Sequence, residues 1–130
     1  MGVYATGWFW RWMRQHRLLE RDLCRAVSEM ARGLIDADLG GGLVKKRIPK
    51  IGQGKRGGFR TIVAKPKSVG WFFIYGFAKS ERENISAAKE ADCRDAADCF
   101  HLLSREERAR RVDVGLLFEV NCHAQDSHDI

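Results

Sequence analysis

Hydrophobic residues four positions apart open the chain and predict an amphipathic helix. Trp8 aligns with Trp12, and Phe9 aligns with Met13, because side chains four residues apart lie on one face of a helix. One face cannot bury three tryptophans that lie within five residues. Trp10 is therefore predicted to be exposed or to contact a partner protein, and the other aromatic side chains to pack in the core.

The flanks of this helix predict two further elements. Val3 to Ala5 are expected to form a short edge strand, and Thr6 is expected to cap the helix, because its hydroxyl can accept a backbone N–H. A second helix is predicted from Glu20 to Arg32, with Gly33 as the left-handed residue that ends it. The two helices are predicted to form a hairpin. The apolar stripe of the second helix comprises Leu23, Val27, Met30 and Leu34.

The middle of the chain changes to a two-residue period, which is typical of strands. Three strands are predicted, from Leu43 to Ile48, Phe59 to Ala64 and Trp71 to Phe77. Pro49 is expected to end the first because proline has no N–H, and residues 65–70 to form a hairpin loop. The third strand is apolar on both faces, which predicts a central position. Alternation in the first strand places Val44, Lys46 and Ile48 on one face and Leu43, Lys45 and Arg47 on the other.

Serine residues mark the starts of two later helices. Ser86 is a candidate N-cap for a helix through about Leu103. Ser104 and Glu107 have the spacing of a capping box, which predicts a short helix to about Val112.

The length of 130 residues predicts one domain. We expect an α+β domain over residues 1–122, in which a small twisted antiparallel sheet packs against the N-terminal helical hairpin and a C-terminal helix. Its last strand is expected after Gly115, and the polar tail, residues 123–130, is expected to be disordered. Neither a membrane helix nor a secretory signal is predicted.

One segment accounts for the net charge of +6. Residues 43–67 hold nine Lys or Arg and no Asp or Glu, and subtracting these nine from the total of 23 leaves 14 basic residues against 17 acidic ones elsewhere. A local excess of this kind attracts polyanions. A solvated basic face is the alternative, but aromatic residues that can stack unpaired bases lie nearby, so RNA binding is favoured. These residues are Phe59, Trp71, Tyr75 and Phe77.

The sequence GQGKRG, residues 52–57, has the glycine spacing of a dinucleotide-binding loop. Such a loop needs a helix directly after its glycines, whereas a strand is predicted here. We therefore expect no nucleotide cofactor. The glycines instead allow the backbone to approach a phosphate chain, or make the loop mobile.

The four cysteines form no C-x-x-C pair, which disfavours a zinc site. They are predicted to be buried, reduced thiols, which indicates a cytoplasmic protein. The cysteines are Cys24, Cys93, Cys99 and Cys122.

The histidines lie outside the basic segment, and no Ser-His-Asp or paired-carboxylate pattern is visible. Lys, Arg and Tyr remain as candidate catalytic groups. RNA can be cleaved without a metal if its 2′-OH attacks the adjacent phosphate while cations stabilise the added negative charge. A Lys among other cations has a lowered pKa and can then transfer protons near neutral pH.

Three ordered motifs resemble the RelE/ParE superfamily of bacterial toxins, in particular its HigB-like branch. They are ARGLIDADLGGG at residues 31–42, KKRIPKIGQGKRGGFRTIVA at residues 45–64 and WFFIYGFAKSERENIS at residues 71–86. The resemblance extends over about residues 3–90, with a weaker match at residues 116–122. It implies a RelE-like α+β fold and a toxin that enters the ribosomal A site and cleaves mRNA there.

The resemblance also implies site residues. The resemblance implies Arg60, Lys79 and Arg82 as catalytic residues, and Tyr75 is added to this catalytic set as an inference from its position in the third strand. The implied RNA-binding set is Lys45, Lys46, Arg47, Lys55 and Arg56. Two positions depart from the family, because Ser80 stands where a basic residue is expected and Ser86 aligns with a late catalytic tyrosine. Tyr75 is the candidate substitute for that tyrosine.

The implied partners are the ribosome, mRNA and a cognate helix-turn-helix antitoxin, with no cofactor and no membrane. Trp10 and the basic residues Lys45, Arg47 and Lys55 are the expected antitoxin contacts. Two alternatives stay open: a protein of this fold that binds nucleic acid or its antitoxin without cleavage, and a ParE-like gyrase inhibitor.

Overall fold

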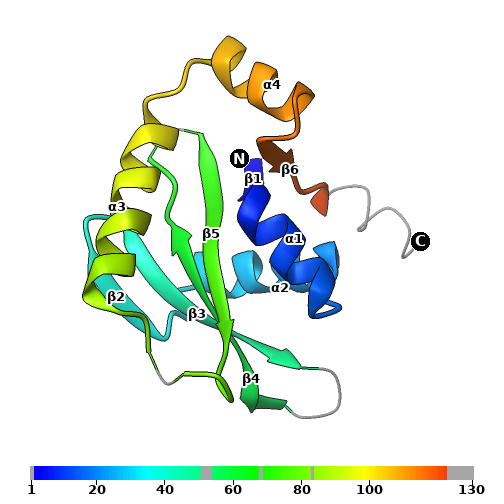
Figure 1. Ribbon diagram of the computed structural model, residues 1–130, viewed down its shortest axis with the longest axis vertical. Helices are drawn as coiled ribbons and strands as arrows, with labels where there is room; N and C mark the ends of the chain where they lie inside the picture. Colours follow the sequence, from blue (N-terminus) through cyan, green and yellow to red (C-terminus); the bar gives the residue numbers. More distant parts are fainter. Residues whose placement is uncertain (1, 51–53, 68, 83, 123–130) are drawn as a thin grey trace.

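The computed structural model describes residues 2–50, 54–67, 69–82 and 84–122, with the backbone alone for residues 54–56. These residues form a six-stranded sheet and four helices (Figure 1), which confirms the predicted α+β fold. The strands are β1 (Gly2–Thr6), β2 (Ala37–Gly40), β3 (Leu43–Lys50), β4 (Gly54–Ala64), β5 (Gly70–Ala78) and β6 (Leu117–Glu119). The helices are α1 (Gly7–Gln15), α2 (Glu20–Ala31), α3 (Ala87–His101) and α4 (Arg105–Asp113). The tail predicted to be disordered, residues 123–130, lies outside the described residues.

The strand order in the sheet is β2-β3-β4-β5-β1-β6. Neighbouring strands are antiparallel except β1 and β5, which run parallel from Gly2 opposite Gly70 to Ala5 opposite Phe73. The prediction of an edge position for β1 is wrong, because β5 lies on one side of it and β6 on the other. The prediction also missed β2, which pairs with the first residues of β3.

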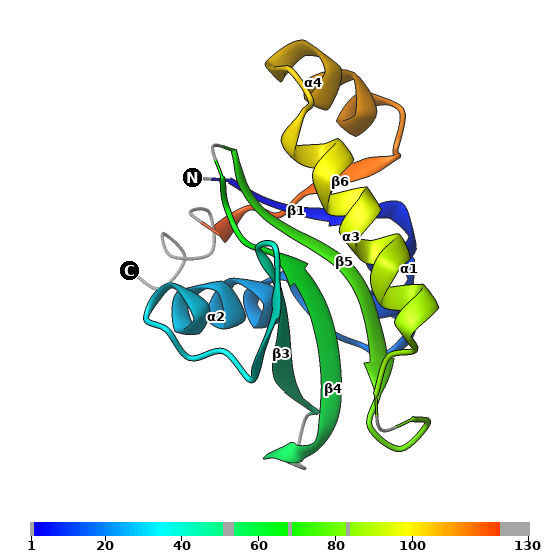
Figure 2. The same cartoon turned by 90° about the vertical axis from the view of Figure 1, so that its left-hand side faces the viewer.

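Helices cover the sheet on both faces. α1 and α2 pack on one face, where Phe9, Met13, Leu23, Met30, Val44 and Phe73 are buried. α3 packs on the other, where Leu43, Ile62, Phe72, Cys93 and Ala97 are buried. α1 and α3 therefore lie on opposite sides of β5 (Figure 1), and α2 lies beside β3 (Figure 2). No helix among the described residues combines the length and apolarity needed to cross a membrane.

A bulge in β5 changes which side chains share a face. The register between β4 and β5 shifts between Ile62 and Val63, so Ile62 lies opposite Tyr75 and Ile74 is the extra residue. A bulge reverses the alternation beyond it. Tyr75 and Phe77 therefore lie on the face that α3 covers.

The local signals for helix ends are confirmed. The hydroxyls of Thr6, Ser86 and Ser104 each accept a hydrogen bond of 3.1 Å from the backbone N–H three residues later. Glu107 completes the predicted capping box by accepting from the Ser104 N–H at 3.0 Å. Gly33 follows α2 with φ of +89°, a conformation that favours glycine.

β3 continues through Pro49 to Lys50, so the prediction that proline ends this strand is wrong. β2 pairs with β3 only from Leu43 to Lys45. The next outward N–H, that of Arg47, donates to the carboxylate of Asp36 at 2.6 Å. Pro49 occupies the following outward position, where it has no N–H to offer. Asp36, which occupies the Arg47 N–H, and Pro49, which has none, protect this sheet edge against pairing with another chain.

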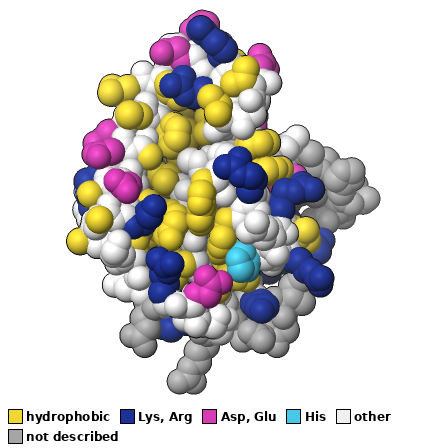
Figure 3. Space-filling model, in the orientation of Figure 1, with side chains coloured by type: hydrophobic (Ala, Val, Ile, Leu, Met, Phe, Trp, Pro, Cys, Tyr) yellow, Lys and Arg dark blue, Asp and Glu magenta, His cyan; other side chains and the backbone are white. Residues whose placement is uncertain are grey.

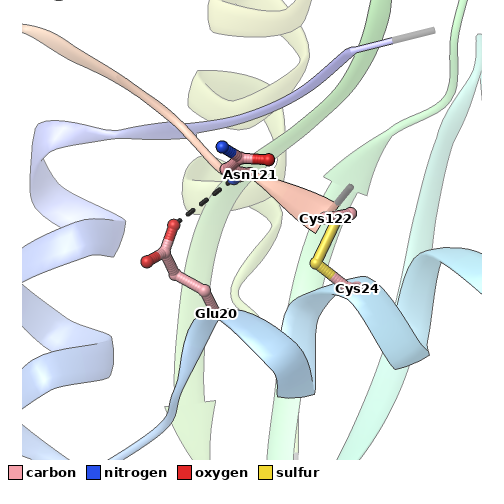
Figure 4. The surroundings of a disulfide bond; sticks show 4 residues. All are labelled: Glu20, Cys24, Asn121 and Cys122. Carbon is pink, nitrogen blue, oxygen red and sulfur yellow. Dashed lines mark hydrogen bonds between the residues drawn. A yellow bond between two sulfur atoms is a disulfide. The ribbon is translucent and has the colours of Figure 1, made fainter. Parts of the chain in front are cut away.

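A disulfide joins Cys24 of α2 to Cys122, which follows β6, with Cα atoms 5.5 Å apart (Figure 4). The prediction of four reduced thiols is wrong for this pair. Cys93 is a buried free thiol, as predicted, whereas Cys99 is free but exposed. The pair forms because β6 returns beside β1 and brings the end of the described chain to α2. This long-range pairing could not be read from cysteine spacing.

Candidate nucleic-acid interface

Two rows of side chains cross β3, β4 and β5 on the face of the sheet that α3 covers. Opposite residues in neighbouring strands lie on the same face. The first row is Lys45, Ile62 and Tyr75, and the second is Arg47, Arg60 and Phe77. Strands are about 4.8 Å apart, so each row spans roughly 10 Å. The rows bring together cations on one side and aromatic residues on the other.

Arg60 lies at the centre of the second row and is only 4% exposed. Its Nη1 donates to the Phe59 carbonyl at 3.5 Å, which is a long hydrogen bond. Burial lowers the pKa of the Arg60 guanidinium, Arg47 lowers this pKa further, and Asp36 raises it. Arginine still stays charged at neutral pH. The row therefore holds two neighbouring cations, and an anion bound between them would relieve their repulsion.

Asp36 fixes Arg47 in this row. Its Oδ2 accepts the Arg47 backbone N–H at 2.6 Å, and its Oδ1 lies 3.4 Å from Arg47 Nε. The Arg47 side chain remains 44% exposed, so its other nitrogen atoms can reach a ligand. Sequence reasoning missed Asp36, which lies within the ARGLIDADLGGG motif that carried the family resemblance.

Lys45 connects the first row to the segment between β5 and α3. Its Nζ donates to Asn84 Oδ1 at 3.3 Å. Lys79 and Arg82 are exposed in the same segment. The Lys79 N–H donates to the Gly58 carbonyl at 3.1 Å, which places Lys79 beside the part of β4 that carries Arg60. Arg60, Lys79 and Arg82 therefore lie toward the same end of the sheet.

Lys46 lies on the opposite face and is not part of these rows. Its side chain is 3% exposed, and its Nζ lies 2.8 Å from Glu29 Oε1. The same Nζ donates to the Leu34 carbonyl at 2.8 Å. The alternation in β3 predicted that Lys46 shares a face with Val44 and Ile48. That placement conflicts with the RNA-binding role that the resemblance implied for Lys46. Lys46 ties α2 to the sheet.

Lys55 and Arg56 lie in the first part of β4, and their side chains lie outside the described residues. The ends of β3 and β4 project past the helices (Figures 1 and 2). From Gly54 the chain is a strand, as predicted, and not the helix that a dinucleotide-binding loop needs after its glycines. Gly52 and Gln53 of the GQGKRG motif lie outside the described residues.

Most of the aromatic residues expected to stack bases are buried. Phe59, Trp71 and Phe77 are 2%, 8% and 2% exposed, while Tyr75 is half-buried. The exposed tryptophan is Trp8, at 43%. Trp10, which was predicted to be exposed or to contact a partner, is partly buried, and its ring stacks on Phe118 with centroids 4.8 Å apart. It is therefore not the exposed tryptophan, and its contact with a partner protein stays a prediction. Figure 3 shows hydrophobic side chains between α3 and α1, with Lys and Arg around them.

The described histidines lie away from the two rows. His16 contacts Trp12 and Phe59 on the α1 face. His101 packs on Phe72, where burial lowers its pKa. Among the described residues, no three His, Cys, Asp or Glu side chains are grouped as a metal would require. The chemistry that the rows offer is electrostatic, because they hold the guanidinium groups of Arg47 and Arg60, the ammonium of Lys45 and the phenol of Tyr75.

A family model described as "RelE toxin of RelE / RelB toxin-antitoxin system" matches residues 1–120. The matched range includes both rows, the segment that carries Lys79 and Arg82, and β6. The comparisons with curated proteins and with solved structures returned no match.

Proposed function

Because the chain belongs to the RelE toxin family, we propose that it is the toxin of a type II toxin–antitoxin pair and acts as a ribosome-dependent mRNA endoribonuclease. The family supports the toxin role and an antitoxin partner. The observation that carries the enzymatic proposal is the second row, where Arg60 and Arg47 lie side by side beside the exposed Lys79 and Arg82 segment.

The proposed reaction uses no metal. The 2′-OH of one nucleotide loses its proton and attacks the adjacent phosphorus, and the bond from phosphorus to the 5′-oxygen breaks as that oxygen gains a proton. Arg60 and Arg47 would stabilise the negative charge on the phosphoryl oxygens. Lys79, Arg82 and Tyr75 are the candidates for proton transfer and further charge stabilisation. Because Arg60 is nearly covered, contact with a phosphate requires neighbouring side chains to move.

The proposed RNA surface comprises Lys45 and Arg47 in the rows, with Lys55 and Arg56 on the projecting hairpin. Ribosomes and mRNA place the proposed activity in the cytoplasm. Thiols there are mostly kept reduced, so the Cys24–Cys122 bond is exposed to reduction in that compartment. The proposed antitoxin is a helix-turn-helix protein that covers this basic surface.

Primer extension on transcripts after induced expression tests the proposal. Wild type should produce new 5′ ends on translated mRNA, and the same purified RNA without ribosomes should stay intact. Arg60→Ala should abolish both cleavage and growth inhibition, with an unchanged circular dichroism spectrum. Arg60→Lys should restore only part of the activity, because an ammonium lacks the planar fork of a guanidinium.

One observation favours a second candidate, a toxin-fold protein that binds RNA without cleaving it. Ser86, which stands at the position of the late family tyrosine, caps α3 by accepting from the Lys89 N–H. Growth inhibition without new transcript ends, in a protein that still binds ribosomes, would support this candidate over the nuclease. Double-strand breaks in DNA instead would indicate a gyrase inhibitor.

A further inference from the structure

A column of three aromatic rings leads from the α1 face to the first row. Trp12 and Trp8 stack with centroids 6.1 Å apart and planes 13° apart. Trp8 then stacks on Tyr75 at 4.6 Å and 30°. The ammonium of Lys89 lies over the Tyr75 ring, 5.2 Å from its centroid. The column therefore ends at the half-buried Tyr75, beside the flexible side chain of Lys89. Lys45 lies at the other end of the same row.

A cavity of about 140 Å³ opens beside this column. It is lined by Trp8 of α1, Ile74 and Tyr75 of β5, and Lys89, Asp92 and Cys93 of α3. Burial raises the pKa of the Cys93 thiol to about 11, so this wall is neutral at physiological pH. The cavity thus combines two aromatic rings, an apolar floor, one cation and one carboxylate.

We propose that this cavity holds one unpaired nucleobase of an RNA strand whose phosphates lie on the cationic rows. The inference rests on the proposed function and names a base-binding subsite for it. Tyr75 and Lys45 are the two ends of one row, separated by a single strand and therefore by roughly 10 Å. Neighbouring parts of one RNA strand can contact both ends. Stacking on aromatic rings is how unpaired bases are commonly held.

The chemistry of the lining favours a base over an apolar side chain of a protein partner. An apolar side chain would cover the Lys89 ammonium and the Asp92 carboxylate without offering either a hydrogen-bonding group, which is costly. A base can stack on the Tyr75 face that Lys89 now covers and lie beside the exposed Trp8. Its carbonyl and amino groups at the edge can then accept from the displaced Lys89 ammonium and donate to Asp92. Lys89 can also leave the Tyr75 ring and pair with a phosphate.

Fluorescence anisotropy with a labelled single-stranded oligoribonucleotide of about eight nucleotides, a length within the usual range of single-strand sites, provides the test. An abasic residue is placed at each position in turn. In wild type, one position should lose roughly tenfold to hundredfold in affinity when its base is absent. Trp8→Ala should lose a similar factor with the intact oligonucleotide and lose nothing further with the abasic one. Trp8→Phe should recover most of the affinity.

Trp10→Ala is the matched control, because Trp10 lies on the same helix and stacks on Phe118 outside the cavity. It should bind intact and abasic RNA as wild type does. The salt dependence of binding should be equal in wild type and Trp8→Ala, since no phosphate contact is removed.

Three results would overturn the subsite. Salt-dependent binding that no abasic position and no Trp8 substitution weakens would remove it while leaving the proposed function intact. Unchanged RNA affinity of Trp8→Ala, with weakened binding to the antitoxin, would assign the cavity to a protein partner. Wild type that neither binds RNA nor cleaves transcripts would overturn the subsite and the proposed function together.

Discussion

The Cys24–Cys122 disulfide joins residues 98 positions apart and fastens the end of β6 to α2. β6 itself is short, with three residues paired to β1. Next to the disulfide, the Asn121 N–H donates to Glu20 Oε1 over 3.4 Å, which is a long hydrogen bond (Figure 4). A cross-link between distant residues stabilises a protein mainly by restricting the unfolded chain. For a loop of this length the chain-entropy relation gives about 4.7 kcal/mol at 25 °C.

We expect the reduced protein to be less stable than the oxidised protein by roughly 3 to 5 kcal/mol, which is a large part of the 5 to 15 kcal/mol typical of a domain. The corresponding fall in Tm is roughly 10 to 20 °C for a chain of this size. Urea unfolding followed by tryptophan fluorescence, with and without dithiothreitol, measures the difference. The double variant Cys24→Ser, Cys122→Ser should match the reduced wild type and ignore dithiothreitol. Cys99→Ser, which removes an exposed free thiol, should behave as wild type.

Two outcomes would refute this reasoning. The first is a count of four free thiols in protein purified without reductant, because the disulfide would then be absent. The second is equal urea midpoints and equal m-values for the oxidised and reduced forms. That result would mean that the unfolded chain gains no freedom when the bond opens, contrary to the chain-entropy relation.

The features that sequence predicted correctly are those that neighbouring residues determine. The caps at Thr6, Ser86 and Ser104 need only a hydroxyl and the N–H three residues later, and Gly33 needs only its own backbone freedom. The faces of β3 followed from alternation alone. The family resemblance named Arg60, Lys79 and Arg82 as site residues, whose roles stay predictions, and it said nothing about how deeply Arg60 is buried.

The features that sequence missed depend on contacts between distant segments. β1 looked like an edge strand because its five residues give no sign that β6 will pair with its other side. Spacing showed that Trp8 and Trp12 share a helix face, but the docking of α1 against β5 decides which tryptophan remains exposed. Trp10 instead meets Phe118 of β6. The bulge at Ile74, which turns Tyr75 toward the candidate interface, also requires knowledge of the β4 register.

Two further substitutions test how position determines role in this chain. Ser86→Ala should cost about 1 kcal/mol of stability by removing the cap of α3, while growth inhibition by the folded protein persists; loss of toxicity without loss of stability would assign Ser86 a direct part in the reaction. Lys45 and Lys46 are adjacent in sequence but point to opposite faces of β3, so they form a matched pair. Lys45→Ala should lower the slope of log affinity for RNA against log salt by about one unit or slightly less. Its stability should change little, because Lys45 is only half-buried and its hydrogen bond to Asn84 is exposed to solvent. Lys46→Met should leave the salt slope unchanged and lower the free energy of unfolding by about 3 kcal/mol, because it breaks a buried ion pair with Glu29. The Glu29 side chain is 18% exposed, so its carboxylate is partly solvated. Urea unfolding and RNA titrations on both variants separate the two roles, and a lowered salt slope in folded Lys46→Met would mean that its ammonium reaches RNA from the far face of the sheet.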